Sequence, residues 1–563
     1  MPEEPHPFFH GEAKLLALLG VLAGLAYATG LGGTDLWDPD EPRFAQVARE
    51  MMRRDDWVLP HLNGEPYHHK PPLYYWLIAA ASKATGGDVT ALSTRIPSVA
   101  MGLASILLTY LLGRLLWSRA AGFLGACAFA TCALTLYLSR RGSIDTTLTA
   151  FTTLALYAFA RNAFLERPRY LWDLVFMAAC AFAVLSKGPV GLAIPLGTAL
   201  FFSIVAGKKK AWSFRLAASS TLAMLLFLAI VFAWLVPACI RGGLDYTMAL
   251  ILKQTVERAA DPWSHQRPFP YYFVNLPWCA FPWFLLFLTG CWHLVVSTKQ
   301  EDRRPVVFLF VWFVFVFAMF TASASKRQVY LLPLLPAAAL IVGKLVADCA
   351  FRPPAVPVPR RLGVPLVLTG AIVAVVGAAG VIGGIWGRPY LEGRNLGGDV
   401  LEAYDRLRAP VTWLSAALFG AGAVAILGVA YRRAPVAFIT LVVAVVGGSA
   451  AAALWVMPDV DPFKSPRELC ARMAARLRHG DDVAMYNLDH EGIMFYLDRR
   501  VRVFDKTETD RLVEFTRGTP TRYVVVTSDD FERRLAPRKD LRLERVDYQG
   551  VGHRKIEVYQ ALR

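Results

Sequence analysis

Charged residues are scarce in this sequence, and it also lacks the motifs of nucleotide-dependent enzymes. Only 18% of its 563 residues are charged, whereas soluble domains carry about 25%. This deficit excludes an ordinary soluble enzyme. No Walker A, GxGxxG or GxSxG motif stands in a suitable strand-to-helix context, so nucleotide hydrolysis is not supported.

Paired cysteines are missing as well. The eight cysteines form no CxxC pair and follow no regular spacing, which indicates neither a disulfide framework nor a zinc cluster. The net charge is +16, but the basic residues stand mostly in short loops between apolar runs. That placement fits membrane topology and lipid phosphate better than nucleic acid. We therefore expect membrane lipids as partners and no DNA or RNA.

Long apolar runs are what the sequence has in abundance, and its mean hydropathy is +0.40. Runs of about 18 or more residues, enough to cross a hydrocarbon core, recur along the first four fifths of the chain. The first run is too long for a removable signal peptide. We predict a mainly α, polytopic fold with about thirteen transmembrane helices. The predicted spans are residues 13–31, 95–117, 119–138, 144–165, 170–187, 189–206, 217–238, 276–297, 306–321, 329–348, 363–386, 411–430 and 435–456.

Lysine and arginine in the short loops predict the orientation of these spans. Cytoplasmic loops are enriched in both residues, and the strongest such signal is residues 208–210. The opposite side then receives residues 32–94 and everything after the last span. Arg140 with Arg141, and Lys326 with Arg327, stand on that second side, where cations are normally scarce. These exceptions indicate an anionic ligand.

Two domains are expected. Residues 1–456 form the membrane domain, and residues 32–94 are its first large outer loop. Residues 457–563 are soluble in composition, with the strand-like stretches DDVAMYN, VRVFD, YVVVTS and KIEVYQ between helical ones such as residues 466–478. This tail is predicted to be a small α/β domain.

The first outer loop is predicted to lie on the membrane. Apolar residues recur at helical spacing from Phe44 to Met51, with arginines on the other faces, which favours an amphipathic interfacial helix. A second interfacial helix is predicted after Lys70, where two prolines suit a helix start and three aromatic residues follow.

The amino-acid sequence of this loop resembles that of a known protein family. DEPRFAQVARE, followed by DDWVLPHLNG and KPPL, resembles the lipid A aminoarabinose transferase (ArnT-like) family, which belongs with the protein O-mannosyltransferases in the GT-C superfamily. The resemblance continues through SIDTTLTAF, LSKGPVGLAIP, HQRPFPYYF and SKRQVYLLPLLPA, so it covers the membrane part. The tail is similar only through MFYLDRRV.

The resemblance implies a membrane glycosyltransferase with a GT-C fold. The enzyme would sit in a bacterial inner membrane, with its active site and C-terminus in the periplasm. It would move a sugar such as 4-amino-4-deoxy-L-arabinose from undecaprenyl phosphate to lipid A or another envelope glycan. Two alternatives stay open. One is a protein hydroxyl as acceptor, as in O-mannosyltransferases, and the other is a flippase for a lipid-linked sugar, which needs polar residues along both halves of the bundle.

Three carboxylates are the candidate catalytic residues. Asp40 comes first, because glycosyl transfer needs a carboxylate that accepts a proton or orients the nucleophile, and the resemblance implies this role. The alternative is an N-cap for the helix that follows. Glu41 is the weaker candidate, an orienting or structural partner. Asp145 stands at the outer end of an apolar span, where an ionisable group is costly; its alternatives are a helix cap or a partner for a neighbouring arginine.

Four cations are candidates for binding the donor's phosphate: Lys70, Arg267, Lys326 and Arg327. Cationic donors bind that phosphate and stabilise its growing charge as the sugar departs. The alternative for each is ordinary snorkelling at the interface. Tyr330 is predicted one turn deeper than Lys326 on the same helix face, either in the cavity or as a plain interface aromatic.

A metal site is an open question at this stage. Relatives often carry glutamate immediately before the lysine of KPP, but this chain has His69 there. Together with His265, neutral imidazoles fit a divalent metal such as zinc. A metal-free site fits the resemblance equally well. We also expect Lys187 to line the cavity or to cap the preceding helix.

Overall fold

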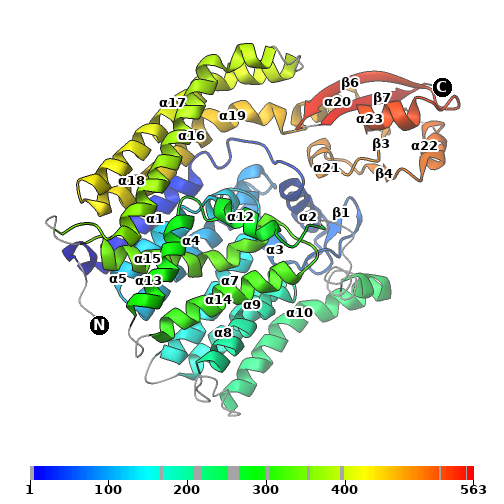
Figure 1. The fold of residues 1–563 in the computed structure, drawn as a ribbon. Helices are drawn as coiled ribbons and strands as arrows, with labels where there is room; N and C mark the ends of the chain where they lie inside the picture. The colour runs from blue at the N-terminus through cyan, green and yellow to red at the C-terminus, as the bar shows by residue number, and fades with distance from the viewer. Residues whose placement is uncertain are drawn as a thin grey trace.

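A computed structural model describes residues 6–164, 169–206, 218–250, 266–298, 303–351, 356–392, 398–518, 521–552 and 554–562. Most of these residues form a helical bundle, and a small mixed sheet follows at the C-terminus (Figure 1). The helices of the bundle are η1 (Pro7–His10), α1 (Glu12–Ala28), α4 (Ala91–Leu116), α5 (Arg119–Ala130), α6 (Ala133–Ser139), α7 (Ile144–Phe164), α8 (Tyr170–Lys187), α9 (Val190–Val205), α10 (Ala218–Met248), α12 (Tyr271–Cys279), α13 (Phe284–Ser297), α14 (Arg303–Ala322), η4 (Gln328–Leu334), α15 (Leu335–Cys349), α16 (Arg360–Glu392), α17 (Gly398–Ala430) and α18 (Ala434–Ala451).

A helix stands at every predicted span, so the mainly helical fold is confirmed. Within the described ranges, eight helices are long and apolar enough to cross a membrane, or up to ten if each bent pair is one span. The predicted number of spans is therefore confirmed only in part. Repeated apolar helices of this length are typical of a multi-pass membrane protein.

Two of the predicted spans are broken rather than straight. Helices α5 and α6 meet at 66°, and α12 and α13 meet at 100°. The two breaks lie against each other, because the Ala133 amide donates to the Phe281 carbonyl at 2.9 Å and the Trp283 indole donates to Thr131 Oγ1 at 2.9 Å. Each break thus supplies partners for polar groups that the interrupted helix leaves exposed.

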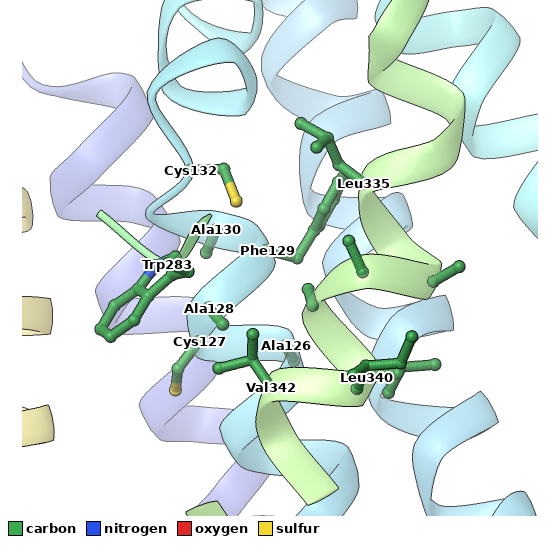
Figure 2. Close-up of a cluster of buried hydrophobic side chains, with 14 of the residues drawn as sticks. Ala126, Cys127, Ala128, Phe129, Ala130, Cys132, Trp283, Leu335, Leu340 and Val342 are labelled. Carbon is green, nitrogen blue, oxygen red and sulfur yellow. The ribbon is translucent and has the colours of Figure 1, made fainter. Parts of the chain in front are cut away.

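The centre of the bundle is packed on small residues. Helix α5 lies between α4 and α15, and Figure 2 shows its side chains facing those of α15 across this contact. A Cβ at Gly343 would overlap the backbone of Gly125, and one at Gly122 would overlap the Tyr110 carbonyl. Close backbone approach of this kind holds helices together in a bilayer, where apolar burial alone favours no contact.

The first outer loop folds as two helices joined by a short hairpin: α2 (Asp40–Arg54), β1 (His61–Leu62), β2 (Glu65–Pro66) and α3 (Leu73–Ala84). Both predicted helices are present. The start of α3 follows Pro72, and no side chain caps it. Aromatic residues of the two helices pack together, with the rings of Phe44 and Tyr74 5.5 Å apart.

The C-terminal unit contains a five-stranded sheet in the order β4-β3-β5-β7-β6. Strand β3 is parallel to β4 and β5, and β7 is antiparallel to both β5 and β6. The predicted stretches became four of these strands, and β6 was missed. The elements after α18 are η5 (Ala452–Val456), α19 (Met457–Val460), η6 (Asp461–Phe463), α20 (Arg467–Arg476), β3 (Asp482–Tyr486), α21 (Glu491–Leu497), β4 (Arg502–Phe504), α22 (Thr509–Thr516), β5 (Arg522–Thr527), α23 (Ser528–Asp530), η7 (Phe531–Leu535), β6 (Leu543–Val551) and β7 (Arg554–Ala561).

Helix α2 lies between the bundle and this C-terminal unit, beside α21 (Figure 1). The sequence predicted that its arginines stand on polar faces of an interfacial helix. Arg49 instead donates to the Phe495 carbonyl at 2.8 Å, and Arg53 forms an ion pair with Asp498 at 2.6 Å. The polar face of α2 therefore packs against the C-terminal unit. Helical periodicity shows which residues share a face but not which segment that face contacts.

Candidate functional site

A cavity of about 500 Å³ lies where α2, the end of α8, the start of α7 and the C-terminal unit converge. We call it the charged cavity, because ionisable groups make up much of its wall. Its lining includes Asp40, Glu41, Arg43, His69, Lys70, Arg141, Asp145, Lys187, Arg327, Tyr330, Asp489 and Glu491. Seven of the ten predicted site residues are in this set.

Asp40 is the first residue of α2, and its carboxylate faces the charged cavity. The N-cap position belongs to Pro39, and no side chain caps the helix, so the cap alternative for Asp40 is wrong. Arg327 donates to Asp40 Oδ2 at 2.5 Å, and Arg43 lies 3.9 Å from Oδ1. Burial alone raises the pKa of this carboxyl, but the charge and hydrogen bond of Arg327 outweigh it and hold the pKa below 3.8. Asp40 is therefore ionised at neutral pH.

Glu41 is buried and fully engaged by other groups. Its side chain is 2% exposed, and it forms ion pairs with Arg95 at 2.8 Å and with Arg141 at 3.3 Å. The amides of Trp37 and Gly142 donate to it as well. Burial raises the pKa of Glu41, but Arg95 and Arg141 outweigh this effect and lower it to about 2. The structural role foreseen for this residue is the one its contacts favour.

Asp145 is the second residue of α7 and is buried, with 8% of the residue exposed. Its partner is Lys187, at the end of α8, and not Arg140 or Arg141 as the alternative proposed. Arg140 is held by the carbonyls of Ala26 and Thr29, both at 2.6 Å. The Lys187 ammonium also lies 4.4 Å from the centre of the Tyr330 ring, so these groups form one wall of the cavity.

Two predicted phosphate ligands lie elsewhere. The Lys326 ammonium is buried and donates to the carbonyls of Ser323, at 2.5 Å, and Arg267, at 3.2 Å. Lys326 precedes η4 and is not helical, so the prediction that it shares a helix face with Tyr330 is wrong. Arg267 is exposed and does not line the cavity. These contacts favour a role for Lys326 in shaping the loop that carries Arg327.

The metal hypothesis stays a prediction. His69 lines the cavity, but His265 lies outside the described residues. Within the part of the chain that the structure describes, no group of three or more His, Cys, Asp or Glu side chains is arranged to hold a metal ion. His69 therefore has no ready-made set of ligands around it there.

Sequence reasoning missed the groups that the C-terminal unit brings to the cavity. Glu491 starts α21, is 2% exposed and forms an ion pair with Arg43. Its second oxygen, Oε2, is buried without a hydrogen bond. Burial raises the pKa of Glu491 to about 7, against the opposing charge of Arg43. In the sequence, the only sign of these groups was a pair of acidic residues, Asp489 and Glu491, just before the stretch MFYLDRRV that resembles the family. No rule of sequence spacing places either residue near Asp40.

The raised pKa of Glu491 predicts a pH-dependent stability. A folded carboxyl with a pKa of about 7 binds its proton more tightly than the unfolded one, near 4.5. The free energy of unfolding should therefore fall, by on the order of 2 kcal/mol, as the pH rises from about 4.5 to 7. Glu491→Gln should flatten this slope, measured as the thermal unfolding midpoint of detergent-solubilised protein across that window. Glu468→Gln, at an exposed site of the same unit, should keep the wild-type slope; equal slopes in all three proteins would contradict the prediction.

Comparisons with known proteins agree with the resemblance. Residues 69–236 match the family model described as dolichyl-phosphate-mannose-protein mannosyltransferase. The undecaprenyl phosphate-alpha-4-amino-4-deoxy-L-arabinose arabinosyl transferase of Pseudomonas paraeruginosa is 32% identical over 336 residues, or 58% of this chain and 58% of that protein. A second transferase of this name, from Proteus mirabilis, is 29% identical over 347 residues, or 60% of each chain. The match thus spans little more than half the length of these relatives.

Solved structures extend the similarity to the whole fold. The crystal structure of ArnT from Cupriavidus metallidurans bound to undecaprenyl phosphate has a TM-score of 0.79 at 18% identity, over 98% of this chain and 99% of that one. The archaeal oligosaccharyltransferase AglB from Archaeoglobus fulgidus has a TM-score of 0.53 at 13% identity, over 92% and 69%. The chain thus shares the fold of the ArnT structure, and the resemblance to ArnT-like proteins is confirmed.

Proposed function

We propose that this chain is a glycosyltransferase that moves a sugar, such as 4-amino-4-deoxy-L-arabinose, from undecaprenyl phosphate to lipid A or another envelope glycan. One observation carries the proposal: the charged cavity brings the ionised carboxylate of Asp40 together with the cations Arg327 and Lys70. A carboxylate beside several cations suits a reaction in which a hydroxyl or phosphate oxygen attacks a sugar and a phosphate departs. The names of the relatives and the shared fold support the same chemistry.

In the proposed reaction, an acceptor oxygen attacks the anomeric carbon while the bond from that carbon to the carrier's phosphate breaks. Asp40 orients the acceptor and, where the acceptor is a hydroxyl, takes its proton. Arg327 and Lys70 receive the phosphate that leaves with the carrier lipid. Arg327 already donates a hydrogen bond to Asp40. When the donor's phosphate also binds Arg327, this cation stabilises the carboxylate less. Asp40 would then bind a proton more readily and be a better base.

Lys187 and Asp145 are assigned a supporting role. Their ion pair joins the ends of α7 and α8 at the cavity wall. The pair keeps the Lys187 ammonium beside the space that the donor would occupy. Because Asp145 carries the opposite charge, neither group is buried as an unpaired charge. We assign Tyr330, whose ring lies next to that ammonium, a hydrogen bond to the sugar.

Purified protein tests the proposal directly. Incubation with undecaprenyl phosphate-linked aminoarabinose and lipid A should release undecaprenyl phosphate and add one sugar to lipid A, both measured by mass spectrometry. The matched family model favours one rival acceptor, a protein hydroxyl; sugar on polypeptides alone would establish that rival. Absence of turnover with any polyprenyl-phosphate sugar would overturn the proposal.

Lys70→Ala should impair transfer far more than folding. Removing a cation placed on the leaving phosphate should lower kcat/KM by about 30- to 1000-fold, equivalent to about 2–4 kcal/mol. Lys83→Ala, at the exposed end of the same α3 segment, is the matched control and should keep wild-type kinetics. Equal kinetics in both variants would mean that Lys70 only extends its charge to the membrane interface.

Lys326→Ala should instead lower the thermal unfolding midpoint. The substitution removes the donor to two carbonyls and leaves them without that hydrogen bond.

The orientation of the chain is proposed to place the charged cavity and the C-terminus in the periplasm of a bacterial inner membrane. Alkaline phosphatase folds only in an oxidising compartment. A fusion after Arg563 should therefore be active, and a fusion within residues 208–210 should be inactive. The reverse pattern would put Asp40 and Lys70 in the cytoplasm and remove the reason for a lipid-linked donor.

A further inference from the structure

A second hollow lies on the flank of the bundle, away from the charged cavity. It has a volume of about 1220 Å³ and lies between α1, α5, α15 and α18. Its walls are almost wholly aliphatic and aromatic, for example Leu22 on α1, Phe123 on α5 and Ile439 on α18. We call it the flank groove. Its lining includes three ionisable side chains, His6, Arg432 and Arg433.

Those three side chains gather at one end of the groove. Arg432 and Arg433 form the turn before α18, and His6 precedes η1. All three are exposed. Two more arginines lie near this end: Arg114 forms an ion pair with Glu12, and Arg119 donates to the His10 carbonyl at 3.0 Å. The groove is thus an apolar trough with a cationic mouth.

The opposite end of the groove is closed by helix contact. Ser449 Oγ, on α18, lies 3.5 Å from the Ala26 carbonyl on α1. One turn further, a Cβ at Gly30 would stand 3.2 Å from the Ala453 carbonyl. The two helices therefore touch on the side of the charged cavity and diverge toward Arg433. A tail entering at the cationic mouth cannot reach Asp40 along this route.

The length of the trough matches one leaflet of a membrane. Along α18 it runs over residues 435–447, which is about 18 Å at 1.5 Å per residue. Half of a hydrocarbon core is about 15 Å. Just before the closed end, nothing lies within 4 Å of a Cβ built at Gly447, so the trough has room for an acyl chain up to that point.

We propose that the flank groove is a binding site for an anionic phospholipid of the leaflet opposite the charged cavity. Its acyl chains lie between α1 and α18, and its phosphate contacts Arg433 and Arg432. Charge complementarity selects this occupant, because a lipid with an apolar body and a negative head fits a trough that is cationic only at its mouth. The closed end separates it from the carrier lipid of the proposed reaction, so the inference does not depend on the proposed function.

Titration of the detergent-purified chain with phosphatidylglycerol, followed by native mass spectrometry, tests the site. Arg433→Ala should weaken binding about fivefold, the contribution of one cation near an anionic lipid. Gly447→Leu should weaken it at least as much, by filling the trough. Two matched controls should bind like wild type: Arg303→Ala, an exposed arginine outside the groove, and Gly420→Leu, a glycine on α17 that also has nothing within 4 Å of its Cβ.

Three results would overturn the proposal. The first is equal binding by wild type and both groove variants. The second is binding of zwitterionic phosphatidylethanolamine as tightly as phosphatidylglycerol, which would leave the arginines without a role. The third is a dimer in wild type that Gly447→Leu dissociates, which would assign the groove to a second copy of the chain.

Discussion

Asp40→Asn should abolish sugar transfer while the protein stays folded and inserted. The amide keeps the shape of the side chain and an oxygen that can accept from Arg327, but it can neither take a proton nor carry the negative charge that orients an acceptor. Loss of a positioned general base costs about 10²- to 10⁴-fold in rate. Because Asp40 caps no helix, the substitution should shift the thermal unfolding midpoint little. The release of undecaprenyl phosphate measures the loss of transfer. The unfolding midpoint of the same variant checks that the protein stays folded.

A matched aspartate stands at the other end of the same helix. Asp55 follows α2 and accepts a hydrogen bond from the Trp57 indole at 2.7 Å, away from the charged cavity. Asp55→Asn should leave both transfer and stability near wild type. If Asp40→Asn retained activity within a few fold of wild type, Asp40 would be only a partner that holds Arg327 in place.

The sequence predicted the parts of the site that depend on local order. Asp40 and Lys70 flank two helices whose starts are set by proline and whose lengths follow from apolar periodicity. Asp145 was found because an ionisable group at the end of an apolar span is costly. Each of these arguments uses residues close together in the chain. All three residues line the charged cavity.

Features that depend on distant segments were missed for the same reason. Glu491 reaches Arg43 across 448 positions, and no periodicity encodes such a contact. The breaks at Thr131 and Phe281 were read as straight spans, because hydropathy measures only length and composition. Strand β6 was overlooked since its charged residues interrupt the apolar alternation that marks a strand. Lys326 was placed by motif alone, which cannot distinguish a phosphate ligand from a lysine that binds carbonyls.

Replacement of Glu41, the immediate neighbour of Asp40, should act on folding instead of chemistry. Glu41 joins three segments: Arg95 on α4, Arg141 with the Gly142 amide before α7, and the Trp37 amide before α2. Glu41→Ala leaves the Arg95 guanidinium, which is 5% exposed, buried without its counter-charge. Breaking a buried pair by removing one partner costs about 3–5 kcal/mol. The thermal unfolding midpoint should therefore fall steeply, together with the yield of monodisperse protein in detergent.

A double-mutant cycle separates this effect from catalysis. Arg95→Leu alone should be similarly destabilising, because it removes the larger of the two charge effects that hold Glu41 ionised. The double variant Glu41→Ala with Arg95→Leu leaves neither of these two charges buried, so its loss of stability should be smaller than the sum of the single losses. If Glu41→Ala unfolded at the wild-type midpoint yet lost all transfer, Glu41 would act on the substrate itself, and the division of labour between these adjacent carboxylates would have to be reversed.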